Sequence, residues 1–304
     1  MPGVVFDRAS SFYDATRGFP PGVAEQVRDQ IALYTAARYD TRFLEIGVGT
    51  GRIALPFVQI GADYTGADLS LPMIEVLRKK IAATSEGAGR LKLALADAMA
   101  LPFAGASFDV IIMIHLLHLV SDWRHTLREC QRLLRDGGWL VLSSNERAEQ
   151  KQREVAAGRT PDGPLPVRQK WNEIMNDLTQ DRSRQPGGQW LANEEVCDAL
   201  AQMGATVRQV TLAEYQHRPI TAREMANLHR DRIFSSDWHH SDDVHAVAWR
   251  RLERWLEHEH SAPDTPYQAQ VQFSVLLAHW TSASPKKQGT ELQLSAEQET
   301  EKRA

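Results

Sequence analysis

The feature that most constrains the fold is a regular alternation of short β-rich runs and helix-like runs that begins at about residue 42. Such alternation is typical of a parallel sheet connected by crossover helices. The strand candidates are "RFLEI", "DYTGA", "LKLALA", "FDVIIMI" and "GWLVLSS", separated by three helical stretches. The last of these stretches, "DWRHTLRECQRLLRDGG", is predicted to be capped by Asp122 and to end at Gly137. We therefore predict an α/β fold with five parallel strands.

Composition and charge exclude several classes of protein. The chain has 304 residues, of which 42% are hydrophobic and 24% charged, so it can bury a large core. A formal net charge of -4 gives no overall attraction to nucleic acid or to an anionic membrane. The longest apolar run, "VIIMIHLLHLV", is too short to span a bilayer, and no targeting segment opens the chain, which predicts a cytoplasmic protein. The two cysteines, Cys130 and Cys197, indicate neither a disulfide framework nor a cysteine zinc site.

Three glycines follow the first predicted strand at alternate positions, in "LEIGVGTGR". Glycines between a strand and a helix let the backbone approach a ligand closely, because no Cβ atom blocks it. Asp68, at the end of the second predicted strand, can accept hydrogen bonds from the two hydroxyls of a ribose. Together these residues predict a cofactor that contains a nucleoside, either NAD or S-adenosylmethionine.

Three details favour S-adenosylmethionine. The last two glycines, Gly49 and Gly51, are two positions apart, whereas the dinucleotide fingerprint places them three apart. Glu45 would repel a pyrophosphate but would suit a cationic amino group. The stretch "ADAMALPFAGASFDVI" adds an acid, Asp97, after the third predicted strand.

With these motifs in order, residues 6 to 145 resemble the class I S-adenosylmethionine-dependent methyltransferases, and in particular the UbiE-like small-molecule branch. The resemblance rests on "YDATRG", "LEIGVGTGRIALP", "GADLSLPMIEVLRKK", "DAMALPFAGASFDVI", "HLLHLVSDW" and "ECQRLLRDGGWLVLS". It implies a Rossmann-like seven-stranded sheet with an antiparallel last strand, an N-terminal helical lid and a helical insertion.

The resemblance also implies a cofactor site. The backbone of Gly47, Gly49 and Gly51 in the glycine loop would run past the methionine moiety of the cofactor. Glu45 would support the amino group of that moiety directly or through water. Asp68 would hold the ribose hydroxyls.

The adenine part of this implied site comes from the second and third strand ends. Leu69 would lie against the adenine, Asp97 would accept a hydrogen bond from the adenine amino group, and the Ala98 amide would contact a ring nitrogen. Met73 and His115 complete the cofactor-binding set.

Two residues of "FYDATRG" match the family's N-terminal lid. The Tyr13 ring would cover the cofactor and the Arg17 guanidinium would meet its carboxylate, a pairing with good geometry. The alternative is a solvated helix with an aromatic ring packed on the sheet.

Methyl transfer from a sulfonium needs mainly positioning and desolvation, and only sometimes a base. The catalytic candidates are His115, His118 and Tyr13, because a histidine near the methyl group could take a proton from the acceptor. Either histidine could instead serve packing.

Outside residues 6 to 145, the pattern predicts several further segments. They are an N-terminal lid segment 1–40, a methyltransferase core of 41–147 and 192–281, an insertion or lid 148–191, a helical excursion 221–260 within the core, and a disordered tail 282–304.

The loop "SSDWHHSDDVH" contains three histidines and invites a metal interpretation. Adjacent loop histidines chelate poorly, and Ser241 or Asp242 suits a helix cap, so we predict no metal. We instead assign the loop to a lid over a small organic acceptor. The proposed lid residues are Trp171, Tyr215, His229, Arg230, Arg232 and Trp238.

These observations predict a methyltransferase that acts on a small molecule at an O, N or C atom. Two alternatives stay open, namely a nucleic-acid methyltransferase and a protein that binds S-adenosylmethionine without turnover. Against nucleic acid, the chain has no basic arm, although "RRLERW" could form a local patch. The sequence does not fix the oligomeric state.

Overall fold

The computed structural model describes residues 6–83, 90–144, 165–179 and 191–281. The predicted tail 282–304 and most of the predicted insertion lie outside the described residues. Within the described residues, no helix is both long enough and apolar enough to cross a membrane.

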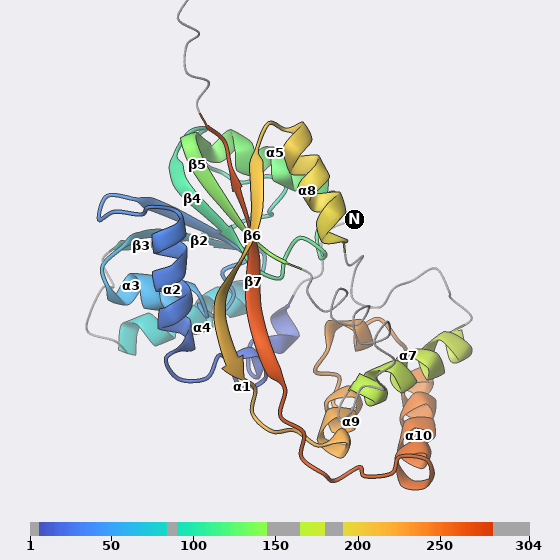
Figure 1. Ribbon diagram of the computed structural model, residues 1–304. Helices are drawn as coiled ribbons and strands as arrows, with labels where there is room; N and C mark the ends of the chain where they lie inside the picture. Colours follow the sequence, from blue (N-terminus) through green and yellow to red (C-terminus); the bar gives the residue numbers. More distant parts are fainter. Residues whose placement is uncertain (1–5, 84–89, 145–164, 180–190, 282–304) are drawn as a thin grey trace, which may run out of the picture.

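The core is a seven-stranded sheet with the strand order β3-β2-β1-β4-β5-β7-β6 (Figure 1). The first five strands pair in parallel, and β7 runs antiparallel to both of its neighbours, β5 and β6. The predicted fold class is confirmed, including the reversed last strand. The strands are β1 Arg42–Ile46, β2 Asp63–Asp68, β3 Leu91–Leu95, β4 Phe108–Met113, β5 Leu134–Ser143, β6 Thr206–Gln216 and β7 Gln270–His279.

Helices cover both faces of the sheet, and each face has its own apolar cluster. One face is covered by α2 Val23–Tyr34, α3 Ala54–Gln59 and α4 Leu71–Ala83. The opposite face is covered by α5 Trp123–Leu133 and α8 Asn193–Gln202. Buried β1 and β4 carry apolar side chains toward both faces, as expected for central strands of a parallel sheet.

A separate group of three helices lies beyond the ends of β6 and β7, at the lower right of Figure 1. This helical unit consists of α7 Leu165–Thr179, α9 Ala222–Arg230 and α10 Asp242–His258. A capping box between Thr221 and Glu224 begins α9, and the Ser241 side chain caps α10 as predicted. The unit has its own apolar core, which includes Trp171, Phe234 and Leu252.

Short N-terminal elements pass across the open end of the sheet. They are the 3₁₀ turn η1 Asp7–Ala9 and the helix α1 Tyr13–Arg17. A second turn, η3 Ser235–Asp237, connects α9 to α10 in the helical unit.

The end of α5 differs from our prediction. Asp122 caps the helix by accepting a hydrogen bond from the His125 amide, as expected. The helix ends at Leu133, however, and not at Gly137. Leu134 already pairs with Phe108 in the sheet, and the left-handed Gly137 (φ 77°) lies in the irregular part of β5 before Trp139 pairs with Val110. Sheet pairing therefore overrides the helix-stop signal.

Candidate cofactor and acceptor site

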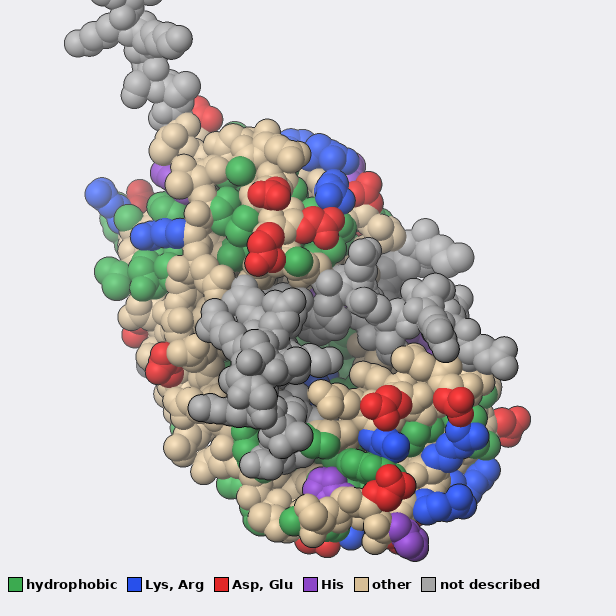
Figure 2. Space-filling view, turned by 45° about the vertical axis from the view of Figure 1, so that its right-hand side comes forward, with side chains coloured by type: hydrophobic (Ala, Val, Ile, Leu, Met, Phe, Trp, Pro, Cys, Tyr) green, Lys and Arg blue, Asp and Glu red, His purple; other side chains and the backbone are tan. Residues whose placement is uncertain are grey.

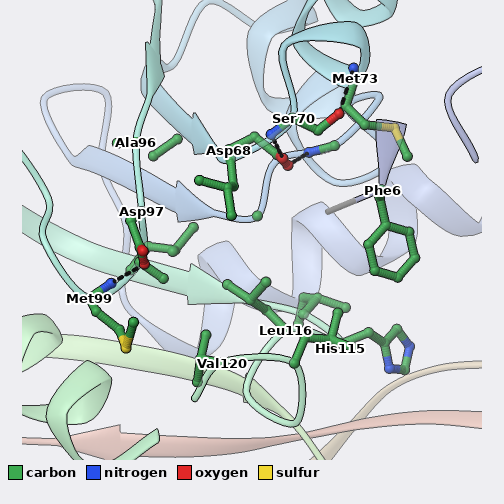
Figure 3. A pocket seen from close by; sticks show the side chains of 18 of the residues that line it. Phe6, Asp68, Ser70, Met73, Ala96, Asp97, Met99, His115, Leu116 and Val120 are labelled. Atoms are coloured by element: carbon green, nitrogen blue, oxygen red, sulfur yellow. Dashed lines mark hydrogen bonds between the residues drawn. The ribbon is translucent and has the colours of Figure 1, made fainter. Parts of the chain in front are cut away.

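A cavity opens at the carboxyl ends of the central strands (Figure 3). The strand order reverses direction between β1 and β4, and ligands of open α/β sheets bind at such a switch point. The lining residues are Phe6, Tyr13, Ile46, Gly47, Gly49, Ala67, Asp68, Leu69, Ser70, Met73, Ala96, Asp97, Ala98, Met99, Ile114, His115, Leu116, Leu119 and Val120.

The glycine loop brings backbone to the edge of this cavity. A Cβ atom on Gly47 would lie 3.1 Å from the Leu116 side chain, so a larger residue would crowd the cavity wall. The Gly49 amide donates a hydrogen bond to Asp68 Oδ2 at 2.7 Å. This hydrogen bond joins the glycine loop to the end of β2 at the cavity.

Asp68 is held from two directions. The Ser70 amide donates to Oδ1 at 2.8 Å, and the Gly49 amide donates to Oδ2. Burial raises the pKa of the Asp68 carboxyl, and hydrogen bonds from the backbone of Ser70, Gly49 and Leu69 oppose that rise. Each carboxylate oxygen has a further lone pair, so Asp68 can accept two more hydrogen bonds from a ligand.

Asp97 follows β3 and lines the same cavity (Figure 3). Its Oδ1 accepts a hydrogen bond from the Met99 amide at 2.9 Å, which fixes the turn after the strand. Leu116 and Val120 provide apolar wall opposite Asp97 (Figure 3). This part of the cavity can therefore hold a flat ring that carries hydrogen-bond donors.

Glu45 lies beneath the loop and is not among the lining residues. It is 3% exposed and accepts a hydrogen bond from the Tyr64 hydroxyl at 2.8 Å. Burial raises the pKa of the Glu45 carboxyl to about 8, against the opposing effects of the Tyr64 hydrogen bond and the Arg52 charge. A cation placed nearby would favour the ionised form.

Three polar contacts tie the N-terminal elements to the cavity rim. Ser70 Oγ donates to Asp7 at 2.6 Å. Asp14 accepts from Thr50 Oγ1 at 2.6 Å and pairs with the Lys80 ammonium at 2.6 Å. The segment 6–17 therefore covers the cavity from one side.

Arg17 is not among the residues that line the cavity. Its guanidinium lies over the Phe234 ring of the helical unit at 5.3 Å, and its carbonyl accepts a hydrogen bond from Arg52 at 2.9 Å. Its predicted contact with a cofactor carboxylate stays a prediction.

The two candidate histidines differ in position. His115 lines the cavity, has a left-handed backbone (φ 55°), and its amide donates to Ser143 Oγ at 2.9 Å. Residues held in this unfavourable region cluster at functional sites. His118 is not among the lining residues, and burial, with a smaller effect of the Arg17 charge, lowers its pKa to about 4. His118 is therefore neutral at physiological pH, and so low a pKa makes it a weak base.

The comparisons with known proteins agree with this geometry. A family model described as "Methyltransferase domain" matches residues 44–142. The ubiquinone/menaquinone biosynthesis C-methyltransferase UbiE of Cereibacter sphaeroides is 32% identical over 141 residues, which are 45% of this chain and 56% of that protein. The match thus spans little more than half of that relative. Demethylmenaquinone methyltransferase of Clavibacter sepedonicus is 28% identical over 239 residues, 75% of this chain and 90% of that protein.

Solved structures share the fold over most of the chain. The YcgJ protein of Bacillus subtilis has a TM-score of 0.52 at 18% identity, covering 84% of this chain and 98% of its own. Protein BH2331 of Bacillus halodurans has a TM-score of 0.54 at 14% identity, covering 84% and 99%. Residues 44–142 thus match a methyltransferase domain, and the chain is similar to methyltransferases of the UbiE-like branch.

The structure gathers most of the predicted cofactor residues in one cavity. Those that line it are Tyr13, Gly47, Gly49, Asp68, Leu69, Met73, Asp97, Ala98 and His115. Arg17, Glu45, Gly51 and His118 lie outside the lining. Gly51 faces α4, where a Cβ atom would come within 2.3 Å of Leu77 Cδ1.

Sequence reasoning missed several residues that line the cavity. Ser70 and Met99 each lie two residues after a predicted site acid, Asp68 and Asp97. Their position in the sequence could therefore have indicated that they line the cavity. Phe6 carries no local signal, because it reaches the cavity through the tertiary path of the N-terminal segment.

Several residues of the predicted acceptor lid are buried and do not face the cavity. Trp171 and His229 are buried in the helical unit, 1% and 4% exposed, and Tyr215 packs edge-on against Phe19. Trp238 reaches the cavity-lining Phe6, with ring centres 5.0 Å apart. His245 Nε2 bonds the His229 carbonyl. Within the described residues, no group of three or more His, Cys, Asp or Glu side chains is arranged to hold a metal.

Proposed function

We propose that this protein transfers a methyl group from S-adenosylmethionine to a small-molecule acceptor. The observation that carries the proposal is a single cavity at the sheet's switch point that unites the glycine loop, Asp68 and Asp97. When bound, S-adenosylmethionine supplies a methyl group on a cationic sulfur; a nucleophilic acceptor attacks the methyl carbon in line and the sulfur leaves with the rest of the cofactor. The protein then has to bind, orient and exclude water.

The cofactor roles follow from the donor and acceptor groups at the cavity. The free lone pairs of Asp68 suit two ribose hydroxyls, since its other lone pairs are already used by the loop and by Ser70. Asp97 and the Ala98 amide suit the amino group and a ring nitrogen of adenine, with Leu69 and Met73 as apolar contacts.

The methionine moiety is proposed to lie along Gly47 and Gly49, which carry no side chain that would narrow the edge of the cavity. Glu45 lies below, and a cofactor ammonium would draw its buried carboxyl toward the ionised form. The segment 6–17 acts as a lid, with Tyr13 over the cofactor. Arg17, outside the cavity lining, would have to turn from Phe234 to meet the cofactor carboxylate.

The acceptor is proposed to enter at the end of the cavity where Phe6 and His115 lie, away from Asp97 (Figure 3). His115 would take a proton from an acceptor that carries one, whereas His118, with a pKa of about 4, is poorly matched to that role at physiological pH. An acceptor without an acidic proton would need only positioning.

Calorimetry tests the cofactor part of this proposal. We expect S-adenosylmethionine and S-adenosylhomocysteine to bind, and Asp68→Ala to weaken binding about 100-fold or more, because hydrogen bonds to a charged group contribute roughly 1.5–3 kcal/mol each. The matched control is Asp63→Ala, at the start of the same strand, whose side chain pairs with Lys92 at the surface. Binding of NAD in place of S-adenosylmethionine would overturn the proposal.

Transfer of a labelled methyl group tests the acceptor class. Pools of small molecules and an RNA preparation are offered in parallel to the wild-type protein. Incorporation into a small molecule supports the proposal, and incorporation only into RNA rejects it. Tight cofactor binding without any incorporation would favour the alternative of a non-catalytic binding protein.

A further inference from the structure

A fully buried carboxylate lies at the centre of the helical unit. Asp237 is 0% exposed and accepts hydrogen bonds from Trp171 Nε1 at 2.9 Å and from His229 Nδ1 at 3.0 Å. Ser236 Oγ adds a longer contact at 3.3 Å. A buried carboxylate is costly unless several donors surround it, so this residue is retained where it holds parts together. Here it connects α7, α9 and η3.

The His229 ring is held rigidly toward Asp237. It stacks on Trp171 with ring centres 4.9 Å apart and packs against Phe234 at 4.7 Å. A carboxylate only accepts, so Nδ1 carries the proton and donates it to Asp237. Nε2 is buried and has no hydrogen-bond partner among the residues that the structure describes. The part of the ring that the structure uses is therefore Nδ1.

The residues next to Asp237 carry this network outward. We name residues 234–238 the η3 segment. On its outer side, Phe234 lies under the Arg17 guanidinium at 5.3 Å, and Trp238 packs edge-to-face against Phe6 at 5.0 Å. The Trp238 indole also donates to the Arg232 carbonyl at 2.8 Å, which fixes the ring. Both outer contacts reach the N-terminal segment that covers the cavity.

Phe6 is the point where the network meets the cavity. It lines the cavity at the end shared with His115 (Figure 3). On one side its neighbour Asp7 is bonded to Ser70, and on the other its ring meets Trp238. The helical unit lies beyond the end of the sheet at the lower right of Figure 1, and Figure 2 shows charged side chains gathered at the lower right of its surface.

We propose that Asp237 and His229 are positioning residues for methyl-acceptor binding, because they fix the η3 segment so that Trp238 holds Phe6 at the acceptor end of the cavity. The part of the proposal that concerns acceptor binding rests on the proposed function. Its structural step, the coupling from His229 to Trp238, does not depend on that function. Asp68 and Asp97 bind elsewhere in the cavity, so cofactor affinity should change little.

One pair of substitutions at the same site separates positioning from simple packing. His229→Asn retains a donor near the position of Nδ1 and removes the unpartnered Nε2, whereas His229→Leu has similar bulk and no donor. Asp177→Ala is the control in the same unit, because it breaks a surface ion pair between α7 and Arg251 of α10. Circular dichroism checks that each variant is folded.

Fluorine NMR of protein labelled with 5-fluorotryptophan tests the structural step without any acceptor. The Trp238 resonance is assigned by its loss in Trp238→Phe. We expect it to shift or broaden in His229→Leu and to stay close to wild type in His229→Asn and Asp177→Ala. An unchanged Trp238 resonance in folded His229→Leu overturns the proposal, whether or not the protein is a methyltransferase.

Kinetics with an acceptor from the labelling screen test the functional step. We expect His229→Leu to raise the acceptor KM about 10-fold, to change the S-adenosylmethionine Kd less than about 2-fold, and His229→Asn to restore the KM. Phe6→Leu should raise the KM as well. If the network acts through Phe6, the double variant should be no worse than the poorer single variant, whereas multiplied effects or a fall in kcat alone would refute the positioning role.

Discussion

Gly51 provides a test of how the glycine loop is divided between packing and ligand contact. Its backbone is left-handed (φ 89°), and a Cβ atom would lie 2.3 Å from Leu77 Cδ1 and 3.1 Å from Leu55 Cγ. The left-handed conformation costs an alanine about 1–2 kcal/mol. Because Leu77 is completely buried, it cannot move aside freely, and overpacking adds about 1–3 kcal/mol. We expect Gly51→Ala to lower the free energy of unfolding by about 2–5 kcal/mol.

Gly61→Ala is the matched control, because Gly61 is also left-handed (φ 79°) but has nothing within 4 Å of the added Cβ atom. It should cost only the backbone part, about 1–2 kcal/mol. Urea unfolding followed by circular dichroism measures both variants. Equal destabilisation of the two would refute the packing argument. The folded fraction of Gly51→Ala should bind S-adenosylmethionine nearly as wild type does, and a selective loss of binding would instead restore Gly51 to the cofactor site.

Further predictions concern pH and the N-terminal contacts. Burial raises the pKa of Glu45 from 4.5 to about 8, so the folded state keeps a proton that the unfolded state loses. The free energy of unfolding should therefore fall as pH rises from about 4.5 to about 8, and Glu45→Gln should flatten this slope in urea unfolding. His118 has the opposite sign: its pKa is lowered from 6.5 to about 4, so stability is lost as pH falls through that window. His118→Gln should reduce this loss, and an unchanged acid limb would contradict the buried neutral ring. Asp14→Ala removes the contact with Thr50 and should raise the dissociation rate of S-adenosylmethionine several-fold in stopped-flow measurements, while Asp29→Ala, on the exposed side of α2, should not.

The sheet was predictable from the sequence because its signals are local. Each of the first five strands is a short β-rich run, and the helices between them are bounded by prolines, glycines and capping residues. The error at α5 has the same origin: a left-handed glycine reads as a helix stop, although Leu134 had already joined the sheet. A single sequence does not report which of two competing pairings is stronger.

The strand-end residues of the site were also predictable, because parallel strands place their carboxyl ends at one edge. Asp68 ends β2, Asp97 and His115 follow β3 and β4, and the three meet at one cavity. Glu45 and Gly51 are adjacent to the same loop in sequence, yet they face Tyr64 and Leu77. Side chains alternate across a strand, so neighbours in the loop can point to opposite sides of the sheet.

The sequence by itself determined the α/β class, the order of the cofactor motifs and the two acids that follow β2 and β3, since all of these depend on periodicity and spacing along the chain. Only the tertiary structure decided that Phe6 lines the cavity, that Arg17 turns toward Phe234, and that the loop residue Asp237 is a buried acceptor in the helical unit. These contacts join segments far apart in the chain, and their partners are chosen by burial and charge, which no local pattern contains.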